Sequence, residues 1–447
     1  MTDVGNSGCG GCRMARRDFL RVGSLGLLGI GLDQYLRAAN GLAPGGGPIQ
    51  GKAQACILVW LEGGPSQMDT WDPKSTSPFK PIATKADGVQ ISDLFPKIAG
   101  QMDKLSIIRS MRSEEVNHPQ GTYYAMTGHR PNPAMNFPSI GSIVAREMGP
   151  RNQLPPYVLA PQPRGSDFSN YRDSFMSAFI GSQYDPMIVP DPSQENFSIP
   201  DLSLPKSISP ELIEHRRSFM RVVDRMFREN EERAAYGKFD AVSEQALAML
   251  SSPTVKTAFD LTQEDEKTRD AYGRDRFGQS VLLARRLVEA GCRFVTASGY
   301  NDGAWDTHAD NDKRLREVLS PTLDRTLSTL LEDLARCGLL DSTIVLVMGE
   351  FGRTPHINPK GGRDHWSQCW SLMVGGGGIA GGRVVGASDE TAGAVTERMT
   401  SIGDLFATIY KAFGIDWEKT YMHPIGRPVK IANSIDDKTG IPIHELV

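Results

Sequence analysis

The chain has few cysteines, little net charge and no apolar run long enough to span a membrane. Its 447 residues include six cysteines, which form no recognisable disulfide framework. Cys9 and Cys12 make an isolated C-x-x-C pair, which alone is weak evidence for a metal site. The formal net charge of -4 gives no indication of a nucleic-acid partner. Internal repeats and low-complexity tails are absent, and 39% hydrophobic residues allow a substantial core.

The N-terminal forty residues are basic and then apolar. Arg16-Arg17-Asp18-Phe19-Leu20 precedes a small and apolar run over residues 22–32. This pattern predicts a twin-arginine export signal over residues 1–40. The run is shorter than the ~20 apolar residues that a spanning helix needs. An amphipathic first helix and an uncleaved anchor remain alternatives.

Export would place the protein in the periplasm or at the cell surface of a bacterium. The twin-arginine machinery would be its partner, and no membrane span would remain after processing. Because this machinery carries folded proteins, the route suits an enzyme that acquires its metal before export. A Gly/Pro-rich linker follows at residues 41–52, and the folded domain is predicted at residues 53–447.

Apolar runs and helical periodicity alternate along this domain. Buried strands are predicted at residues 55–61, 105–109, 157–159, 293–297, 344–348 and 371–374. Helices are predicted at residues 121–126, 139–148, 211–232, 241–250, 276–290, 315–336 and 402–413. Residues 161–209 are rich in Pro, Ser, Asp and Asn and predict a long surface excursion. The alternation predicts an α/β fold with a mostly parallel central sheet and helices on both faces.

Four polar clusters follow predicted strands or open predicted helices. The first runs from Glu62 through Gly63-Gly64 to Asp69, directly after the first strand. Both acids are candidate metal ligands, and the alternative for each is a turn or helix-cap carboxylate. The second begins at His118, where free backbone N–H groups of a helix start can face an anion. The alternative is that His118 caps a turn.

The other two clusters carry closely spaced acids and imidazoles. Asp306 and His308 stand two residues apart, so both can face one way on an extended loop. The alternative is a polar, water-facing loop.

The last cluster ends a buried strand at Glu350 and continues to Asp364 and His365 on a Gly-rich loop. Arg353 and Arg363 lie nearby and could bind an oxyanion bidentately. The alternative for His365 is structural hydrogen bonding to the loop. Ligands in open α/β sheets bind outside the carboxyl ends of strands, so these clusters predict one site.

The order of these motifs resembles the domain of unknown function 1501 family, within the alkaline phosphatase and sulfatase superfamily. The resemblance covers nearly the whole chain from about residue 53, and it rests on Glu-Gly-Gly-Pro-Ser, Asp-x-His, Gly-Glu-Phe-Gly-Arg-Thr-Pro and Gly-Gly-Arg-Asp-His-Trp. It implies an alkaline phosphatase-like fold with one or two divalent cations, such as zinc, calcium or magnesium. The implied metal ligands are Glu62, Asp306, His308, Glu350 and His365, with Asp364 as a ligand or as the residue that orients His365.

The nucleophile position departs from the sulfatase pattern. Nine residues before Thr127, where a formylglycine sulfatase carries its Cys, this chain has His118. We therefore expect no formylglycine chemistry. His118 could act as nucleophile or as acid/base, and attack by metal-bound water is the other route. Thr122 and Ser113 are less favoured hydroxyl nucleophiles.

The resemblance implies a metal-dependent hydrolase of phosphate or sulfate esters, acting on a small molecule or a glycan outside the cytoplasm. Arg353 or Arg363 would neutralise the ester oxyanion. A non-catalytic binding protein at the cell surface is the alternative, since fold does not fix function. A phosphoglycerate-mutase-like isomerase is disfavoured because its substrates are cytosolic.

Overall fold

The computed structural model describes residues 42–43, 47–48, 51–163, 165–199, 218, 249–250, 252–300 and 304–447. The expected export signal, most of the 41–52 linker and nearly all of the expected helices 211–232 and 241–250 lie outside these residues. Strands β1 (Leu42–Ala43) and β2 (Gly47–Pro48) form a small antiparallel pair. Residues 51–447 form one compact unit.

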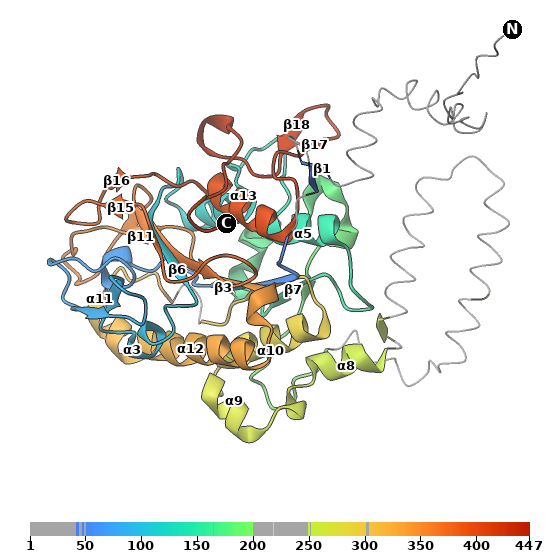
Figure 1. Cartoon of the computed structure of the whole chain (residues 1–447), viewed down its shortest axis with the longest axis horizontal. Coiled ribbons are helices and arrows are strands. Elements are labelled where there is room, and N and C mark those ends of the chain that lie inside the picture. Colours follow the sequence, from blue (N-terminus) through green and yellow to red (C-terminus); the bar gives the residue numbers. More distant parts are fainter. Residues whose placement is uncertain are drawn as a thin grey trace, which may run out of the picture. The chain divides into compact units, whose positions relative to one another are not determined.

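An eight-stranded sheet forms the centre of this unit (Figure 1). In spatial order its strands are β14 (Val384–Val385), β6 (Ser106–Met111), β13 (Trp370–Gly375), β10 (Thr343–Met348), β3 (Ala55–Trp60), β9 (Phe294–Ala297), β7 (Tyr157–Ala160) and β8 (Met187–Ile188). All neighbouring strands pair in parallel except β13, which is antiparallel to both β6 and β10. The prediction of a mostly parallel sheet is confirmed.

Strand β3 shows why these runs become central strands. Every side chain from Ala55 to Trp60 is buried. Ile57 and Val59 enter the core on one face of the sheet, whereas Leu58 and Trp60 enter the core on the other. Because successive side chains alternate across a strand, a continuous apolar run is stable only where both faces are covered.

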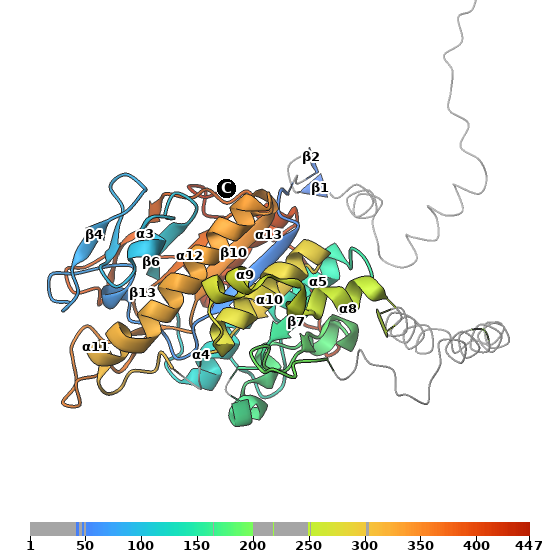
Figure 2. The same cartoon turned by 90° about the horizontal axis from the view of Figure 1, so that it is seen from below.

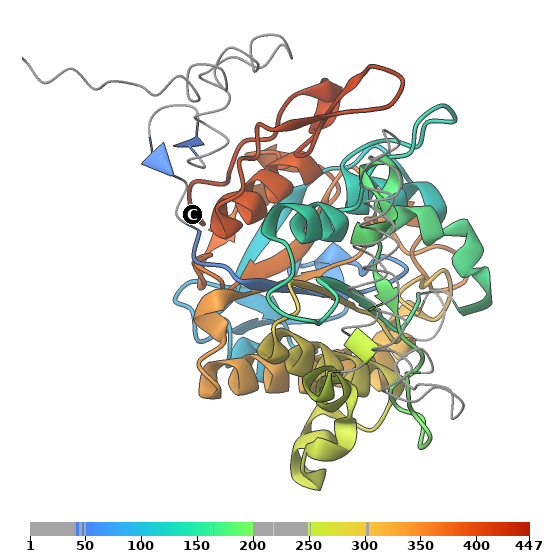
Figure 3. The same cartoon turned by 90° about the vertical axis from the view of Figure 1, so that its right-hand side faces the viewer.

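Helices cover both faces, as predicted. One face carries α3 (Pro96–Ala99), α8 (Pro253–Phe259), α9 (Glu266–Tyr272), α10 (Arg276–Ala290) and α12 (Ser320–Arg336), seen from below in Figure 2. The opposite face carries α4 (His118–Thr127), α5 (Ile140–Met148) and α13 (Ile402–Phe413). In Figure 3 the red α13 and the yellow-orange α10 and α12 lie on opposite sides of the sheet.

The local sequence explains where these helices begin and end. The Asp275 side chain accepts the N–H of Gly278 and caps α10, and Gly291 ends it in the left-handed conformation. The predicted helix 315–336 is interrupted. Short α11 (Asn311–Arg314) leads into a π-helical turn at Leu315–Leu319, and α12 follows. Pro321 lacks an N–H donor, which favours such a widened turn before it.

Smaller elements lie around the sheet. Antiparallel pairs form between β4 (Pro81–Ala83) and β5 (Gln90–Ser92), β15 (Ala387–Ser388) and β16 (Val395–Glu397), and β17 (Thr420–Met422) and β18 (Pro428–Lys430). The expected excursion at residues 161–209 contains several 3-10 turns, and it also contributes edge strand β8. No helix in the described residues has the length and apolar character of a membrane span.

Candidate metal centre

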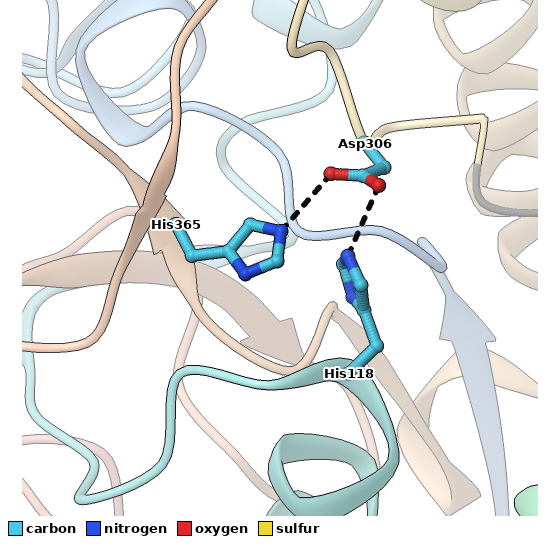
Figure 4. A group of neighbouring side chains, drawn as sticks. All are labelled: His118, Asp306 and His365. Carbon is cyan, nitrogen blue, oxygen red and sulfur yellow. Dashed lines mark hydrogen bonds and ion pairs between the residues drawn. The ribbon is translucent and has the colours of Figure 1, made fainter.

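Two loops and one helix start meet at the carboxyl edge of the sheet. His118 is the first residue of α4, and Asp306 lies on the loop that follows β9. His365 opens β12 (His365–Trp366), which pairs with β11 (Gly352–Arg353) on the segment after β10. One ligand atom from each of these three residues lies within 4.8 Å of the others. Figure 4 shows the two imidazoles pointing toward the Asp306 carboxylate.

His308 extends this group on its solvent side. Its Nε2 lies 3.0 Å from Asp306 Oδ1 and 2.9 Å from His365 Nε2. His365 Nε2 lies 3.2 Å from Asp306 Oδ1, and His118 Nε2 lies 3.2 Å from Asp306 Oδ2. Donor atoms about 2.0–2.2 Å from a shared ion are separated by roughly these distances.

The opposite nitrogen of each imidazole faces an oxygen acceptor. His118 Nδ1 donates to Glu350 Oε1 at 2.5 Å, and His308 Nδ1 donates to Asp364 Oδ1 at 2.7 Å. His365 Nδ1 donates to the carbonyl of Val116 at 2.6 Å. Because ionised carboxylates and carbonyls only accept hydrogen bonds, the proton of each neutral ring lies on Nδ1.

The Nε2 atoms therefore carry lone pairs that converge on one another and on Asp306. The nearest acceptor to the buried Nε2 of His118 is the Asp306 carboxylate, 3.2 Å away. Lone pairs of His308 and His365 facing each other at 2.9 Å repel unless a cation binds both nitrogens or one ring carries a second proton. Fixing the proton on Nδ1 in this way is how proteins orient metal-binding histidines. The chemistry of the donor set thus fits a metal ion.

The charges of the centre also favour a divalent cation. Asp306, Glu350 and Asp364 contribute three carboxylates in direct contact with its imidazoles. Arg353 contributes one guanidinium, whose Nη2 lies 2.5 Å from Asp306 Oδ1. With all imidazoles neutral, two negative charges remain, and a divalent cation would neutralise them.

Ionisation of the central groups follows from these contacts. Burial opposes the charge on Asp306, but His118, His365 and Arg353 outweigh it and hold the pKa of its carboxyl far below the usual range. Burial also opposes a charge on His118, yet the adjacent Asp306 and Glu350 raise the pKa of its imidazole. For Arg353, burial is the largest influence and lowers the pKa of the guanidinium.

The solvent exposure of the side chains increases across the centre, from Glu350 and His118 to His308 and Asp364. The Glu350 side chain is 0% exposed and that of His118 is 10% exposed. His308 and Asp364 are 44% and 50% exposed. A small molecule can therefore reach the cluster from the side of His308.

Close backbone approaches hold the loops together. A Cβ on Gly362 would lie 2.0 Å from the His308 carbonyl carbon, so only glycine allows this contact. The Gly63 N–H donates to both carboxylate oxygens of Glu350 at 3.1 and 3.2 Å. The Asn358 side chain donates to the His308 carbonyl at 3.0 Å and to Asp364 at 3.1 Å.

The structure places the sequence-selected residues in different positions relative to the cluster. Asp306 and His365 offer atoms to a common centre, and His308 Nε2 lies next to both of them. His118, expected as nucleophile or acid/base, lies among these donors. Glu350 was expected as a ligand, and its carboxylate contacts Nδ1 of His118. Asp364 was expected as a ligand or as the residue that orients His365, and its carboxylate contacts Nδ1 of His308.

Two further candidates lie beside the cluster. Glu62 is buried just after β3, and its carbonyl accepts the Trp305 N–H. Arg353 is fully buried, and besides Asp306 its guanidinium donates to the carbonyls of Gly63, Gly64 and Arg363. Its position is that of a counter-charge to Asp306 rather than of a group open to an ester.

Arg363 is not brought to the cluster in a form that could bind substrate. It is fully buried and pairs with the equally buried Asp69, with Nε 2.7 Å from Oδ2. Its Nη1 donates to the carbonyls of Thr354 and Pro355. The Asp69 carboxylate also accepts from Ser77 and Asn311. This ion pair ties the loop after β3 to the loop after β10.

Some contributors had no sequence signal. The Val116 carbonyl orients His365, and Asn358 orients Asp364, yet neither residue type indicates such a role by itself.

Comparison with known proteins places the chain in a family. The family described as "Protein of unknown function (DUF1501)" matches residues 53–446. The chain belongs to this family. No curated protein matches the chain significantly.

Several solved structures are distantly similar to this family member. The lipoteichoic acid synthase LtaP from Listeria monocytogenes is 10% identical, with 90% of this chain and 82% of that chain covered and a TM-score of 0.41. A protein in the alkaline phosphatase superfamily from Vibrio parahaemolyticus is 14% identical over 82% and 68% of the two chains, with a TM-score of 0.38. The phosphonate monoester hydrolase of Agrobacterium radiobacter is 14% identical, with 88% of this chain and 77% of that chain covered and a TM-score of 0.34. These TM-scores lie below 0.5, and neither the site nor its chemistry is inferred from them.

Proposed function

We propose that this protein is an exported, metal-dependent hydrolase of phosphate or sulfate esters. The observation that carries the proposal is the convergence of imidazole Nε2 atoms on Asp306 while each Nδ1 donates to a fixed acceptor. A divalent cation would stabilise this constellation, and its exposed side at His308 leaves room for a substrate.

In this scheme His118, Asp306, His308 and His365 hold one divalent cation. Glu350, Asp364 and the Val116 carbonyl fix the ring orientations, and Arg353 balances the Asp306 charge. A set rich in imidazoles favours zinc or a similar transition metal over calcium and magnesium, which prefer oxygen ligands. A bound cation of this kind polarises an ester oxygen and lowers the pKa of a coordinated water to ~7.

The test is metal analysis of the purified protein combined with a screen of aryl phosphates and aryl sulfates. We expect about one divalent ion per chain and turnover of at least one ester class. His365→Ala should lose both metal and turnover. His444→Ala is the matched control, because His444 is 82% exposed and contacts only Glu445 among the described residues.

Two outcomes would count against the proposal. Unchanged metal content in His365→Ala would refute the assignment of that ligand. Metal bound by the parent protein without turnover of any ester would instead favour a non-catalytic binding protein.

The export part of the proposal rests on Arg16 and Arg17 in the sequence. Replacing both by Lys should retain the protein in the cytoplasm, because the twin-arginine route reads this pair. Cell fractionation measures the result, and equal periplasmic yields of parent and variant would contradict it.

A further inference from the structure

A cavity of about 310 Å³ opens at the same sheet edge as the metal centre. Arg112, Gln368, Val395, Thr396, Arg398 and Met399 line it. Arg112 follows the last residue of β6, and Gln368 lies two residues before β13. The wall between them is completed by β16 and the residues after it.

Chain connectivity keeps this cavity close to the proposed ligands. Gln368 follows His365 by three residues, so their Cα atoms are at most about 11 Å apart. The N–H of Ser113 donates to the Ser367 carbonyl at 3.0 Å, which joins the segment of Arg112 to that of Gln368. The same two segments meet again where His365 donates to Val116.

One guanidinium in the cavity retains an unneutralised charge. Arg398 pairs with both carboxylate oxygens of Glu445, at 2.6 and 2.5 Å. Arg112 is exposed, and no carboxylate within the described ranges pairs with its side chain. A free guanidinium presents a planar set of donors that matches a carboxylate, sulfate or phosphate.

The rest of the lining suits an organic group that carries such an anion. Val395 and the 45% exposed Met399 offer apolar surface. Gln368 and Thr396 offer polar atoms at the same wall. A bare inorganic ion would use only the guanidinium and the polar atoms, whereas a larger substrate would also use the apolar surface.

We propose that Arg112 binds a second anionic group on the ester substrate, so that the enzyme prefers polyanionic esters. This inference rests on the proposed hydrolase function, and it assigns Arg112 to substrate specificity rather than to bond cleavage.

The experiment compares monoesters and bis-esters of the same alkanediols, from short to long chains. The esters are phosphates or sulfates, whichever class the enzyme turns over in the aryl ester screen. The parent enzyme should show a lower KM for the bis-ester at the chain length that spans the two sites. Arg112→Gln should raise that KM about five- to tenfold with little change in kcat, as expected for loss of a charge-assisted contact in a solvent-accessible cavity. Arg112→Lys should restore part of the preference, because it keeps the charge but not the planar donors.

Arg427→Gln is the control, since this exposed arginine lines neither the cavity nor the metal centre. It should leave the preference intact. Equal KM values for mono- and bis-esters in the parent enzyme, or an unchanged preference in Arg112→Gln, would overturn the inference.

Calorimetric titration with alkane bis-sulfonates, which resist hydrolysis, separates the two proposals. If no ester is turned over but Arg112→Gln weakens bis-sulfonate binding, the hydrolase proposal fails and the anion subsite stands. If esters are turned over while bis-sulfonate affinity is the same in parent and Arg112→Gln, the subsite fails alone.

Discussion

Glu350 tests whether the imidazole cluster is built for a metal. Its carboxylate is fully buried, accepts from His118 Nδ1 at 2.5 Å and accepts twice from the Gly63 N–H. Glu350→Gln keeps the size of the side chain but removes the charge. One of the two carboxylate oxygens is then replaced by an NH₂ group, which cannot accept a hydrogen bond from His118 or from the Gly63 N–H.

The expected loss follows from the burial of the contact. Groups that orient a metal-binding histidine typically contribute 10–100-fold in metal affinity, or ~1.4–2.8 kcal/mol. Glu350 should lie near the upper end, since no water can replace its carboxylate. Asp364 makes the same type of contact to His308 but is 50% exposed. Asp364→Asn should therefore cost only ~0.2–1 kcal/mol, at most about fivefold in affinity.

Competition for Zn²⁺ with a chromophoric chelator of known affinity measures both variants against the parent protein. Circular dichroism and urea unfolding check that each variant is folded. A Glu350→Gln affinity within about threefold of the parent, or a larger loss in Asp364→Asn, would refute the role assigned to the buried carboxylate.

Other expectations concern charge, pH and packing. Arg363→Ala should lower the free energy of unfolding in urea by ~3–5 kcal/mol, because it leaves the buried Asp69 unpaired, and Arg363→Ala with Asp69→Ala should cost less than the sum of the single changes. Without metal, the raised pKa of His118 stabilises the fold fully below pH ~6.5 and progressively less as pH rises through the raised value. The melting temperature measured in the presence of a chelator should therefore fall as the pH rises above ~6.5, and a melting temperature independent of pH would contradict the raised pKa of His118. The affinity for Zn²⁺ should rise with pH, because protons compete with the metal for the imidazoles. Gly362→Ala should lower the free energy of unfolding by ~1–3 kcal/mol, because its methyl group would overlap the His308 backbone. It should also weaken Zn²⁺ binding in the same competition assay, and unchanged binding would show that the close contact between Gly362 and His308 does not position the imidazole.

The fold was largely predictable because its strongest signals are local. The apolar run at residues 55–60 and the helical periodicity at residues 276–290 each needed only neighbouring residues to be recognised. The two-residue strands β8 and β14 were missed, since so short a segment carries no periodicity. The reversed direction of β13 was also not predictable, because orientation depends on partners chosen in three dimensions.

For the candidate site, the sequence indicated which strand ends carry suitable residues and did not indicate the role of each. The histidines and acids stood at strand ends, which indicated a common edge. Whether Glu350 binds a metal or orients His118 depends on a contact between residues 232 positions apart. The burial of Arg363 against Asp69 spans 294 positions and removes an expected substrate contact. Local sequence holds no information on such pairings.

The reversed strand β13 has a topological consequence. Parallel neighbours must be linked by a crossover that returns to the opposite edge, usually through a helix. Because β13 runs opposite to β10, the segment 349–369 leaves the sheet and re-enters it at the same edge, as one continuous arch. The whole arch is thereby available to carry Glu350, Arg353, Asp364 and His365. The middle of this segment includes Asn358, which donates to the His308 carbonyl and to Asp364, so an insertion there would alter the metal centre while leaving the strands in place.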